Sequence, residues 1–207
     1  MSFISNSIGK RFEDIFTGDF PDFKRVESED NILPDFFNGS FWIEAKVAYR
    51  DYGVRLKQVQ IDNFRRLKEP VIYIVGFHNL YGTLRKLIQR TERGRQRYLE
   101  RHMGMDSAYF VTDDVIRAIW NREHRLSRKK GLIYCTLKMR FLKNIIDNNS
   151  FKRNGEELVA DEYYGIDRGR LALQHTKKSV STFPYGFLLD RKKDKKCIEY
   201  LKERSLV

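Results

Sequence analysis

A continuous apolar run, PVIYIVGF at residues 70 to 77, limits the possible folds of this chain more than any other segment. The run holds no charged side chain and has only the length of a strand, so it suits a strand that is covered on both faces at the centre of a sheet. Residues 54 to 68, just before it, place Leu56, Phe64 and Leu67 on one side of an amphipathic helix. A buried strand preceded by such a helix indicates an α/β fold.

The segments upstream of the run extend this alternation of helix and strand. Apolar residues at helical spacing predict a short helix over residues 7 to 16, and we expect Gly18 to end it. We expect three strands next, over residues 23 to 28, 32 to 38 and 41 to 47. The last two meet at Asn38-Gly39, a pair typical of tight hairpin turns. The order helix, three strands, helix, strand predicts an α/β fold with a mixed central β-sheet flanked by helices.

Downstream of the run, helix and strand continue to alternate. Residues 80 to 103 favour a very basic helix, and residues 108 to 112 favour a strand. Thr112 or Asp113 would then cap the helix that follows. The later segment LIYCTLKMRFL is ambiguous between strand and helix.

The pattern weakens after about residue 150, where glycine and charge alternate with short apolar pieces. We therefore interpret residues 1 to 150 as one domain. Residues 151 to 207 form a basic C-terminal extension in this interpretation, either packed on the core or placed in a dimer interface. Residues 182 to 187, TFPYGF, are a candidate dimer surface, and residues 197 to 206 favour a last helix.

The charge of the chain points to a polyanionic partner. Its 40 Lys and Arg residues against 28 Asp and Glu residues give a net charge of +12, which favours nucleic acid as that partner. The expected helix over residues 80 to 103 supplies the first candidate phosphate contacts: Arg85, Lys86, Arg90, Arg93, Arg95 and Arg97. A second basic group is Arg122, Arg125, Arg128, Lys129 and Lys130. A solvated surface would also explain both groups without a partner.

Missing motifs exclude several classes of protein. The two cysteines, Cys135 and Cys197, form no CxxC pair, which excludes a four-cysteine zinc site. The four histidines show no metal-ligand spacing, so we interpret them as structural or surface residues. The sequence has neither a Walker-type phosphate loop nor Ser-His-Asp spacing. It also shows no signal peptide and no apolar stretch of membrane-spanning length, so we expect a soluble, cytoplasmic protein with no membrane partner.

One predicted strand, FWIEAKV at residues 41 to 47, carries two charged residues in an apolar run. Because successive side chains of a strand point to opposite faces, Glu44 and Lys46 share one face with Trp42. Asp35 can lie near them on the strand across the hairpin turn. Two carboxylates beside an ammonium group make a site of hard oxygen ligands that suits Mg²⁺ or Mn²⁺. The lysine could orient or deprotonate an attacking water, or neutralise charge that develops on a phosphate.

This constellation resembles the motif of a known nuclease superfamily. Pro34-Asp35, eight intervening residues and then Glu44-Ala45-Lys46 read as the PD-(D/E)XK motif. The expected order of elements is similar to the αβββαβ core of that superfamily, which is the restriction-endonuclease-like fold.

Two further residues extend the resemblance to residues 8 to about 77. Many members of the superfamily carry a glutamate on the first helix, where this chain has Glu13, and a glutamine on the helix after the motif strand, where it has Gln60. Within the superfamily, the chain looks most like archaeal Holliday-junction resolvases and related viral or RecB-like nucleases.

The resemblance implies a role for each of these residues. The implied ligands of a divalent metal, Mg²⁺ or Mn²⁺, are Glu13, Asp35, Glu44 and the carbonyl group of Ala45. Lys46 would position the water nucleophile, and Gln60 would orient the phosphate or the lysine. The implied catalytic set is Asp35, Glu44, Lys46 and Gln60.

The implied activity is that of a metal-dependent DNA endonuclease that hydrolyses phosphodiester bonds. A structure-specific enzyme of DNA recombination, like a junction resolvase, would cut two symmetric strands, so we would then expect a homodimer. Branched, single-stranded and duplex DNA all remain candidate substrates. The alternatives are a non-catalytic nucleic-acid-binding protein that retains the nuclease fold, and a restriction or repair nuclease.

The residues themselves leave further alternatives open. Asp22, in a second Pro-Asp pair, competes with Asp35 as the metal ligand, although it lies before a whole extra strand. Gln58 competes with Gln60. Glu44 and Lys46 could form an ordinary ion pair on an exposed strand face, a kind of pair that contributes little. Trp42 could stack on a base or pack against the neighbouring strand.

Overall fold

The computed structural model describes residues 3–28, 32–39, 42–49, 52–80, 87, 90–127, 131–145, 150–165 and 173–175. Within these residues the main sheet has six strands in the order β1-β2-β3-β5-β6-β11. They are β1 (Lys24–Arg25), β2 (Phe36–Phe37), β3 (Trp42–Tyr49), β5 (Val71–His78), β6 (Met105–Thr112) and β11 (Leu173–His175). β3 and β5 run parallel and the other neighbours run antiparallel, so the fold is α/β with a mixed sheet, as predicted.

The apolar run at residues 70 to 77 forms β5, the strand between β3 and β6. All eight residues of β5 are buried, which confirms the prediction of a central strand covered on both faces. Gly76 lies under Phe12 of α1 (Phe3–Asp19). A Cβ atom at Gly76 would overlap the Phe12 ring and the Met105 methyl group, so the packing of this helix requires a glycine there.

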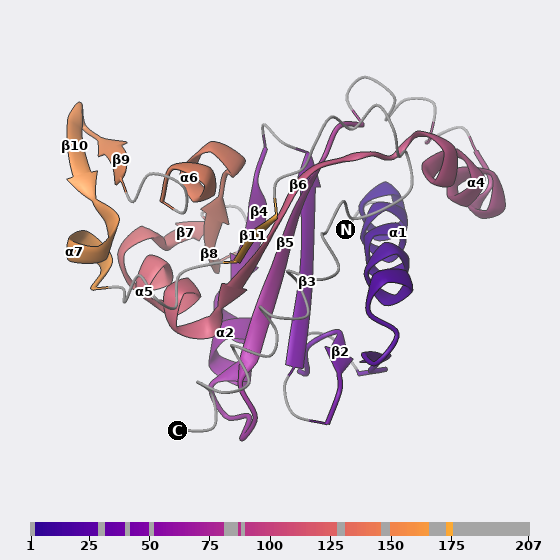
Figure 1. Ribbon diagram of the computed structural model, residues 1–207, viewed down its shortest axis with the longest axis horizontal. Coiled ribbons are helices and arrows are strands. Elements are labelled where there is room, and N and C mark those ends of the chain that lie inside the picture. Colours follow the sequence, from indigo (N-terminus) through magenta and orange to yellow (C-terminus); the bar gives the residue numbers. More distant parts are fainter. Residues whose placement is uncertain are drawn as a thin grey trace.

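Helices cover both faces of the main sheet (Figure 1). α1 lies on one face, and α2 (Gln58–Phe64) and α5 (Asp113–Glu123) lie on the other. α4 (Glu92–His102) packs beside α1, whereas α6 (Met139–Lys143) and α7 (Ala160–Tyr164) lie near α5. One core lies between α1, α4 and the sheet and includes Phe12, Ile43 and Leu99. The other lies between the opposite face, α2 and α5 and includes Tyr73 and Ile61. None of the described helices is both long and apolar enough to cross a membrane.

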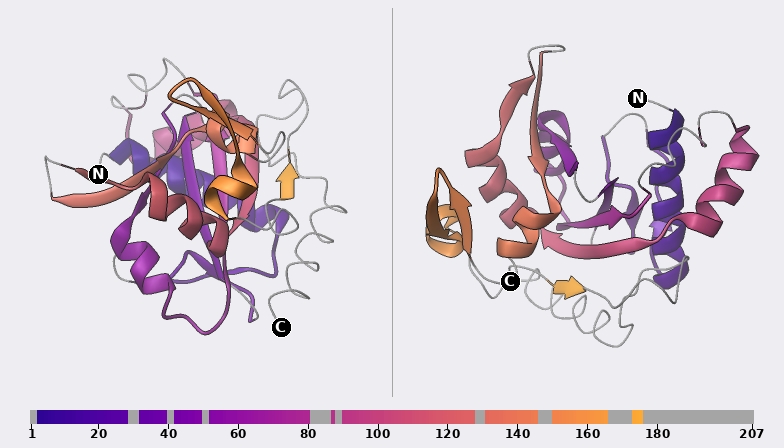
Figure 2. Two further views of the ribbon diagram at one scale, coloured as in Figure 1. Left: turned by 90° about the vertical axis from the view of Figure 1, so that its left-hand side faces the viewer. Right: turned by 90° about the horizontal axis from the view of Figure 1, so that it is seen from above.

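A second, three-stranded sheet has the order β4-β8-β7. Its strands are β4 (Val54–Lys57), β7 (Arg125–Ser127) and β8 (Leu132–Leu137). The β7–β8 hairpin projects away from the main sheet in both views of Figure 2. A separate hairpin, β9 (Ser150–Arg153) and β10 (Glu156–Val159), precedes α7.

Two of the predicted helix boundaries were wrong. Residues 54 to 57 form the strand β4, because Val54 and Leu56 bury their side chains opposite β8; the helix starts only at Gln58. α1 continues through Gly18 to Asp19, because the packing of Phe16 and Phe20 outweighs the weak helix propensity of glycine.

Other segments follow the predictions more closely. The strand expected over 108 to 112 is part of β6. Thr112 occupies the N-cap position of α5, but its side chain makes no capping hydrogen bond. The ambiguous segment LIYCTLKMRFL forms both a strand, β8, and a helix, α6. The basic helix expected over residues 80 to 103 was too long, because α4 begins only after Thr91, whose Oγ1 atom accepts a hydrogen bond of 3.2 Å from the Gly94 amide.

The region after residue 150 is described only in part. Phe151, Ala160 and Tyr164 are buried in the same core as α5. Residues 182 to 187, the candidate dimer surface, and residues 197 to 206, the expected last helix, lie outside the described residues.

Candidate functional site

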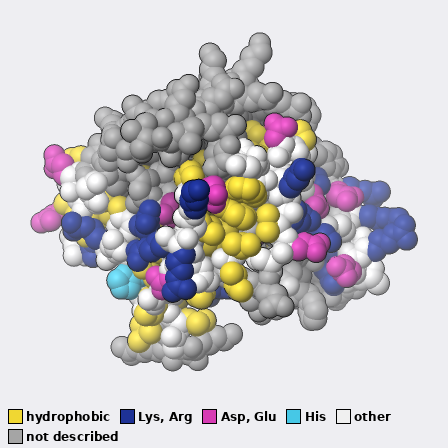
Figure 3. All heavy atoms as spheres, turned by 90° about the horizontal axis from the view of Figure 1, so that it is seen from below, with side chains coloured by type: hydrophobic (Ala, Val, Ile, Leu, Met, Phe, Trp, Pro, Cys, Tyr) yellow, Lys and Arg dark blue, Asp and Glu magenta, His cyan; other side chains and the backbone are white. Residues whose placement is uncertain are grey.

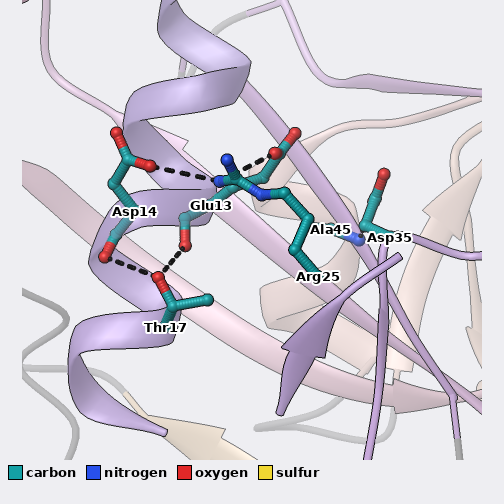
Figure 4. A network of polar contacts seen from close by, with 6 residues as sticks. All are labelled: Glu13, Asp14, Thr17, Arg25, Asp35 and Ala45. Carbon is teal, nitrogen blue, oxygen red and sulfur yellow. Dashed lines mark hydrogen bonds and ion pairs between the residues drawn. The ribbon is translucent and has the colours of Figure 1, made fainter. Parts of the chain in front are cut away.

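The candidate site begins at an edge of β3 where backbone pairing stops. β2 pairs with β3 only through Phe36–Ile43 and Phe37–Trp42. Beyond that point the Asp35 carboxylate takes the place of a partner strand, because its Oδ2 atom accepts a hydrogen bond of 2.7 Å from the Ala45 amide (Figure 4). The amide and carbonyl groups of one strand residue face the same edge, so the Ala45 carbonyl group also faces the edge where Asp35 lies.

Glu44 follows on the face of β3 that packs toward α2. Its side chain is only 2% exposed, and its Oε1 atom accepts hydrogen bonds from Gln60 Nε2, at 2.8 Å, and from Lys46 Nζ. Burial raises the pKa of Glu44 to about 7; Lys46 opposes this shift and the Asp35 carboxylate adds to it. The strand therefore holds a carboxylate that needs a positive charge nearby to stay ionised.

Glu13 reaches the same region from α1, on the opposite face of the sheet. The Arg25 guanidinium binds it at 3.1 Å and also binds Asp14 at 3.1 Å, as Figure 4 shows. Burial, and then the charge of Asp35, raise the pKa of Glu13 to about 7, although Arg25 and Lys46 partly offset them. Glu13 and Asp35 are therefore close enough to repel each other when both are ionised.

Lys46 is the cation shared by this cluster. Burial alone would lower its pKa, but the carboxylates of Glu44, Asp35 and Glu13 more than offset burial and raise the pKa above the usual 10.5. Lys46 is therefore an ammonium group at neutral pH. Its side chain is 21% exposed, so solvent reaches this side of the cluster.

The structure thus brings together the residues that the motif singled out: Glu13, Asp35, Glu44, Ala45, Lys46 and Gln60. We refer to them as the β3 cluster.

Each of the residues that the sequence left as an alternative lies elsewhere or is oriented differently. Asp22 is exposed in the turn after α1, and Gln58 is exposed whereas Gln60 is buried. Trp42 stacks on Phe37 of the neighbouring strand at 4.3 Å between ring centroids, and its Nε1 donates to Glu69 at 3.2 Å.

The metal ligands stay a prediction. In the part of the chain that the structure describes, no three or more His, Cys, Asp or Glu side chains come together as a ready-made metal site. The donor set nevertheless fits a divalent cation, because hard oxygen atoms are the ligands that Mg²⁺ prefers. The pKa values of Glu13 and Glu44 are both raised to about 7, chiefly by burial and in part by the charge of Asp35, so an added cation would favour the ionised forms of both carboxylates.

The predicted phosphate contacts on α4 and just before it divide into two groups. Arg90 lies over the Tyr98 ring at 4.7 Å, and Arg95 donates to the Arg90 carbonyl at 2.6 Å, so both support the local structure. Arg93 and Arg97 are exposed. In Figure 3, Lys and Arg side chains gather at the right-hand end, where Figure 1 places α4. Two predicted contacts, Arg85 and Lys86, lie outside the described residues.

Sequence reasoning missed Arg25, which joins β1 to the first helix through Glu13 and Asp14. No sequence pattern marks it, because the contact depends on how α1 crosses the sheet.

His78 agrees with the structural role expected of the histidines: it is 4% exposed, its Nδ1 accepts a hydrogen bond of 3.2 Å from the Leu80 amide, and burial lowers its pKa to about 4.

Comparisons of this chain with protein-family models, with curated proteins and with solved structures found no match. A functional assignment therefore comes from its own residues and their geometry.

Proposed function

We propose that this chain is a metal-dependent endonuclease that hydrolyses phosphodiester bonds in DNA, built on a restriction-endonuclease-like core. The observation that carries the proposal is the Asp35 carboxylate bound to the Ala45 amide at the unpaired edge of β3. Glu44 and Lys46 follow on the same strand, so acidic oxygen atoms and an ammonium group meet at one edge of the sheet. This combination suits phosphodiester hydrolysis, because negative charge must be stabilised while water attacks.

A divalent cation, Mg²⁺ or Mn²⁺, would be held by the carboxylates of Glu13, Asp35 and Glu44 and by the Ala45 carbonyl group. When bound, it would stabilise charge on the phosphoryl oxygen atoms and lower the pKa of a water ligand. Gln60 fixes the Glu44 carboxylate through its 2.8 Å hydrogen bond and thereby keeps one ligand in place.

Lys46 has an electrostatic role in this proposal. Because the neighbouring carboxylates raise its pKa, we treat its amine as protonated at neutral pH rather than as the base that accepts a proton from water. The ammonium group instead orients the water and neutralises charge that develops on the phosphate. Of the three roles that the sequence left open for the lysine, the proposal keeps two, orienting the water and neutralising phosphate charge, and leaves out deprotonating the water.

The substrate class follows from charge. The net charge of +12 and the exposed Arg93 and Arg97 on α4 favour a polyanion, and a phosphodiester backbone supplies both the charge and the scissile bond. A junction resolvase would in addition act as a homodimer, since it cuts two strands symmetrically.

The test is a substrate panel of end-labelled branched, single-stranded and duplex DNA, incubated with Mg²⁺, Mn²⁺ or EDTA. We expect cutting only with metal, and a loss of about 100-fold or more in Glu44→Gln and Lys46→Met. The matched controls are Glu27→Gln and Lys24→Met, which change the same residue types at exposed positions near β1 and should cut like the wild type. Cutting that persists in EDTA or in Glu44→Gln would contradict the proposal.

A non-catalytic DNA-binding protein is the second candidate. It is favoured by one observation: Lys46 and Arg25 already neutralise Glu44 and Glu13, so the acidic residues have partners without a metal. DNA binding without cutting under every metal condition would support this candidate. A restriction or repair nuclease would differ from a resolvase by cutting duplex DNA at a defined sequence.

A further inference from the structure

The small β4-β8-β7 sheet presents an outer face with an unusual charge pattern. In its register Lys57 lies opposite Tyr134, and Tyr134 lies opposite Arg125. Residues opposite each other in an antiparallel pair share a face, so these three side chains form one row across the sheet. The two cations are two strands, or about 10 Å, apart, with the tyrosine between them.

A third cation completes this group. Arg55 lies opposite Thr136, two residues from Tyr134 on the same face, and its guanidinium sits over the Tyr134 ring at 5.2 Å. Arg55 and Arg125 are exposed. The three strands contain no Asp or Glu residue. We call Arg55, Lys57, Arg125 and Tyr134 the outer-face group.

The opposite face of the same sheet serves a different purpose. Leu56, Cys135 and Leu137 are buried in the core with α5. The sheet is therefore fixed in place from within, while its outer face stays open to solvent. Two large apolar side chains of the projecting hairpin are also exposed: Leu126 by 64% and Leu132 by 48%.

The outer face is connected to the β3 cluster by the chain itself. β4 is the next strand after β3, and it leads directly into α2. Lys57 immediately precedes α2, three residues before Gln60, which binds Glu44. A polymer lying along the cluster would therefore have β4 and its neighbours close by.

We infer that the outer face of the β4-β8-β7 sheet is a second DNA-binding surface, separate from the residues that would cut. Arg55 and Arg125 would contact phosphates, and Tyr134 would stack on a base or sugar. Two exposed arginines, Arg55 and Arg125, together with a partly exposed aromatic ring, are the combination that binds a nucleic-acid strand. The choice of DNA as the ligand rests on the proposed function, whereas the surface itself is argued from register, charge and exposure.

The test measures DNA binding in EDTA, so that no cutting occurs. Fluorescence anisotropy with labelled duplex and single-stranded oligonucleotides would compare Arg55→Gln, Arg125→Gln, Tyr134→Ala and Tyr134→Phe with the wild type. Arg65→Gln is the matched control, because Arg65 is also exposed but is paired with Asp62 on α2. Thermal melting of each variant shows that it folds.

We expect each arginine variant to reduce the slope of log affinity against log salt by about 0.9 on duplex DNA, which corresponds to one lost phosphate contact. Tyr134→Ala should bind about 10-fold more weakly, because one stacked base is lost, and Tyr134→Phe should retain most of the affinity. Arg65→Gln should keep the wild-type slope.

The inference is overturned if the folded variants bind DNA with the affinity and salt slope of the wild type, or if the wild type does not bind DNA in EDTA. These outcomes differ from a failure of the proposed function. A wild-type protein that never cuts but loses binding in the outer-face variants would remove the nuclease proposal and leave the second surface standing.

Discussion

The Asp35 carboxylate has two separable functions in the β3 cluster. It accepts a hydrogen bond from the Ala45 amide, and it supplies negative charge beside Glu13 and Glu44. An asparagine can accept the same hydrogen bond through its amide oxygen but carries no charge. The two functions can therefore be tested by two substitutions at one position.

We expect the free energy of unfolding of Asp35→Asn, measured in urea, to lie within about 0.5 kcal/mol of the wild-type value. Asp35→Ala should lower it by about 1 to 3 kcal/mol, because the Ala45 amide is left without its acceptor. Both variants should lose metal-dependent cutting. Equal stability of the two variants would show that the hydrogen bond does not hold the edge of β3. Cutting by Asp35→Asn at the wild-type rate would argue against a ligand role for the carboxylate.

His78 predicts a dependence of stability on pH. Burial lowers its folded-state pKa to about 4 from the usual 6.5, so between these pH values the unfolded chain binds a proton that the folded chain does not. The free energy of unfolding therefore rises as pH increases from 4 to 6.5, and the contribution of His78 is complete above that range. A pKa shift of this size corresponds to a change of about 3 kcal/mol in the free energy of unfolding across that pH range.

The measurement is urea unfolding of the wild type and His78→Asn at several pH values from 4 to 8. The asparagine oxygen can accept the Leu80 hydrogen bond but does not titrate in this range. Glu13 and Glu44 titrate in both proteins, so their contribution cancels in the difference between the two curves. A difference that stays constant with pH would contradict a buried neutral His78.

At the scale of elements, the position of α1 on the sheet depends on Gly76. A methyl group there would overlap the Phe12 ring and Met105, so Gly76→Ala should destabilise the protein by about 1 to 3 kcal/mol. The control is Gly9→Ala within α1, where no atom lies within 4 Å of the added carbon. That variant should gain about 0.5 to 1 kcal/mol, since alanine favours the helix. Thermal unfolding checks that the two substitutions change stability in opposite directions.

A second readout connects Gly76 to the cluster. α1 carries Glu13, so a displaced helix should move that carboxylate away from Asp35 and weaken cutting as well as stability. A Gly76→Ala variant that is destabilised but cuts with unchanged metal dependence would show that Glu13 is not needed at the site.

The elements differ in how far sequence alone could predict them. β5 was predictable because a strand buried on both faces must be apolar throughout. β4 was not, because Leu56 also lies at helical spacing with Phe64 and Leu67; only the pairing of residues 54 to 57 with β8, about 80 residues later, makes this segment a strand. Propensity describes local preference, whereas this strand depends on a distant partner.

In the β3 cluster, too, some features follow from the local sequence and others depend on distant contacts. The relative placement of Asp35, Glu44 and Lys46 followed from strand alternation and a hairpin turn, both local properties. The Ala45 hydrogen bond and the Arg25 ion pairs depend on where β2 ends and how α1 crosses the sheet. Such three-dimensional details leave no periodic signal in the chain.

At the scale of the whole molecule, the described part of the C-terminal region is joined to the core near α5. Tyr164 donates to Glu123 at 3.1 Å, and Arg153 forms an ion pair with the same carboxylate at 3.1 Å. Phe151 is 5% exposed and stacks on Tyr164 at 5.2 Å between ring centroids. Residues 150 to 165 therefore pack with α5 and α6, across the boundary that the sequence placed at residue 150.

This packing predicts that the full chain unfolds as one unit through residue 165. Phe151→Ala should lower the free energy of unfolding by about 3 to 5 kcal/mol, because a buried aromatic ring is removed from the common core. Val159→Ala is the control, since Val159 is 42% exposed and its loss should cost less than about 1 kcal/mol. Urea unfolding would be followed by tryptophan fluorescence, because Trp120 lies on α5 in the same core. If residues 151 to 165 were a separable extension, Phe151→Ala would leave the main transition at its wild-type midpoint, and the domain would indeed end at residue 150.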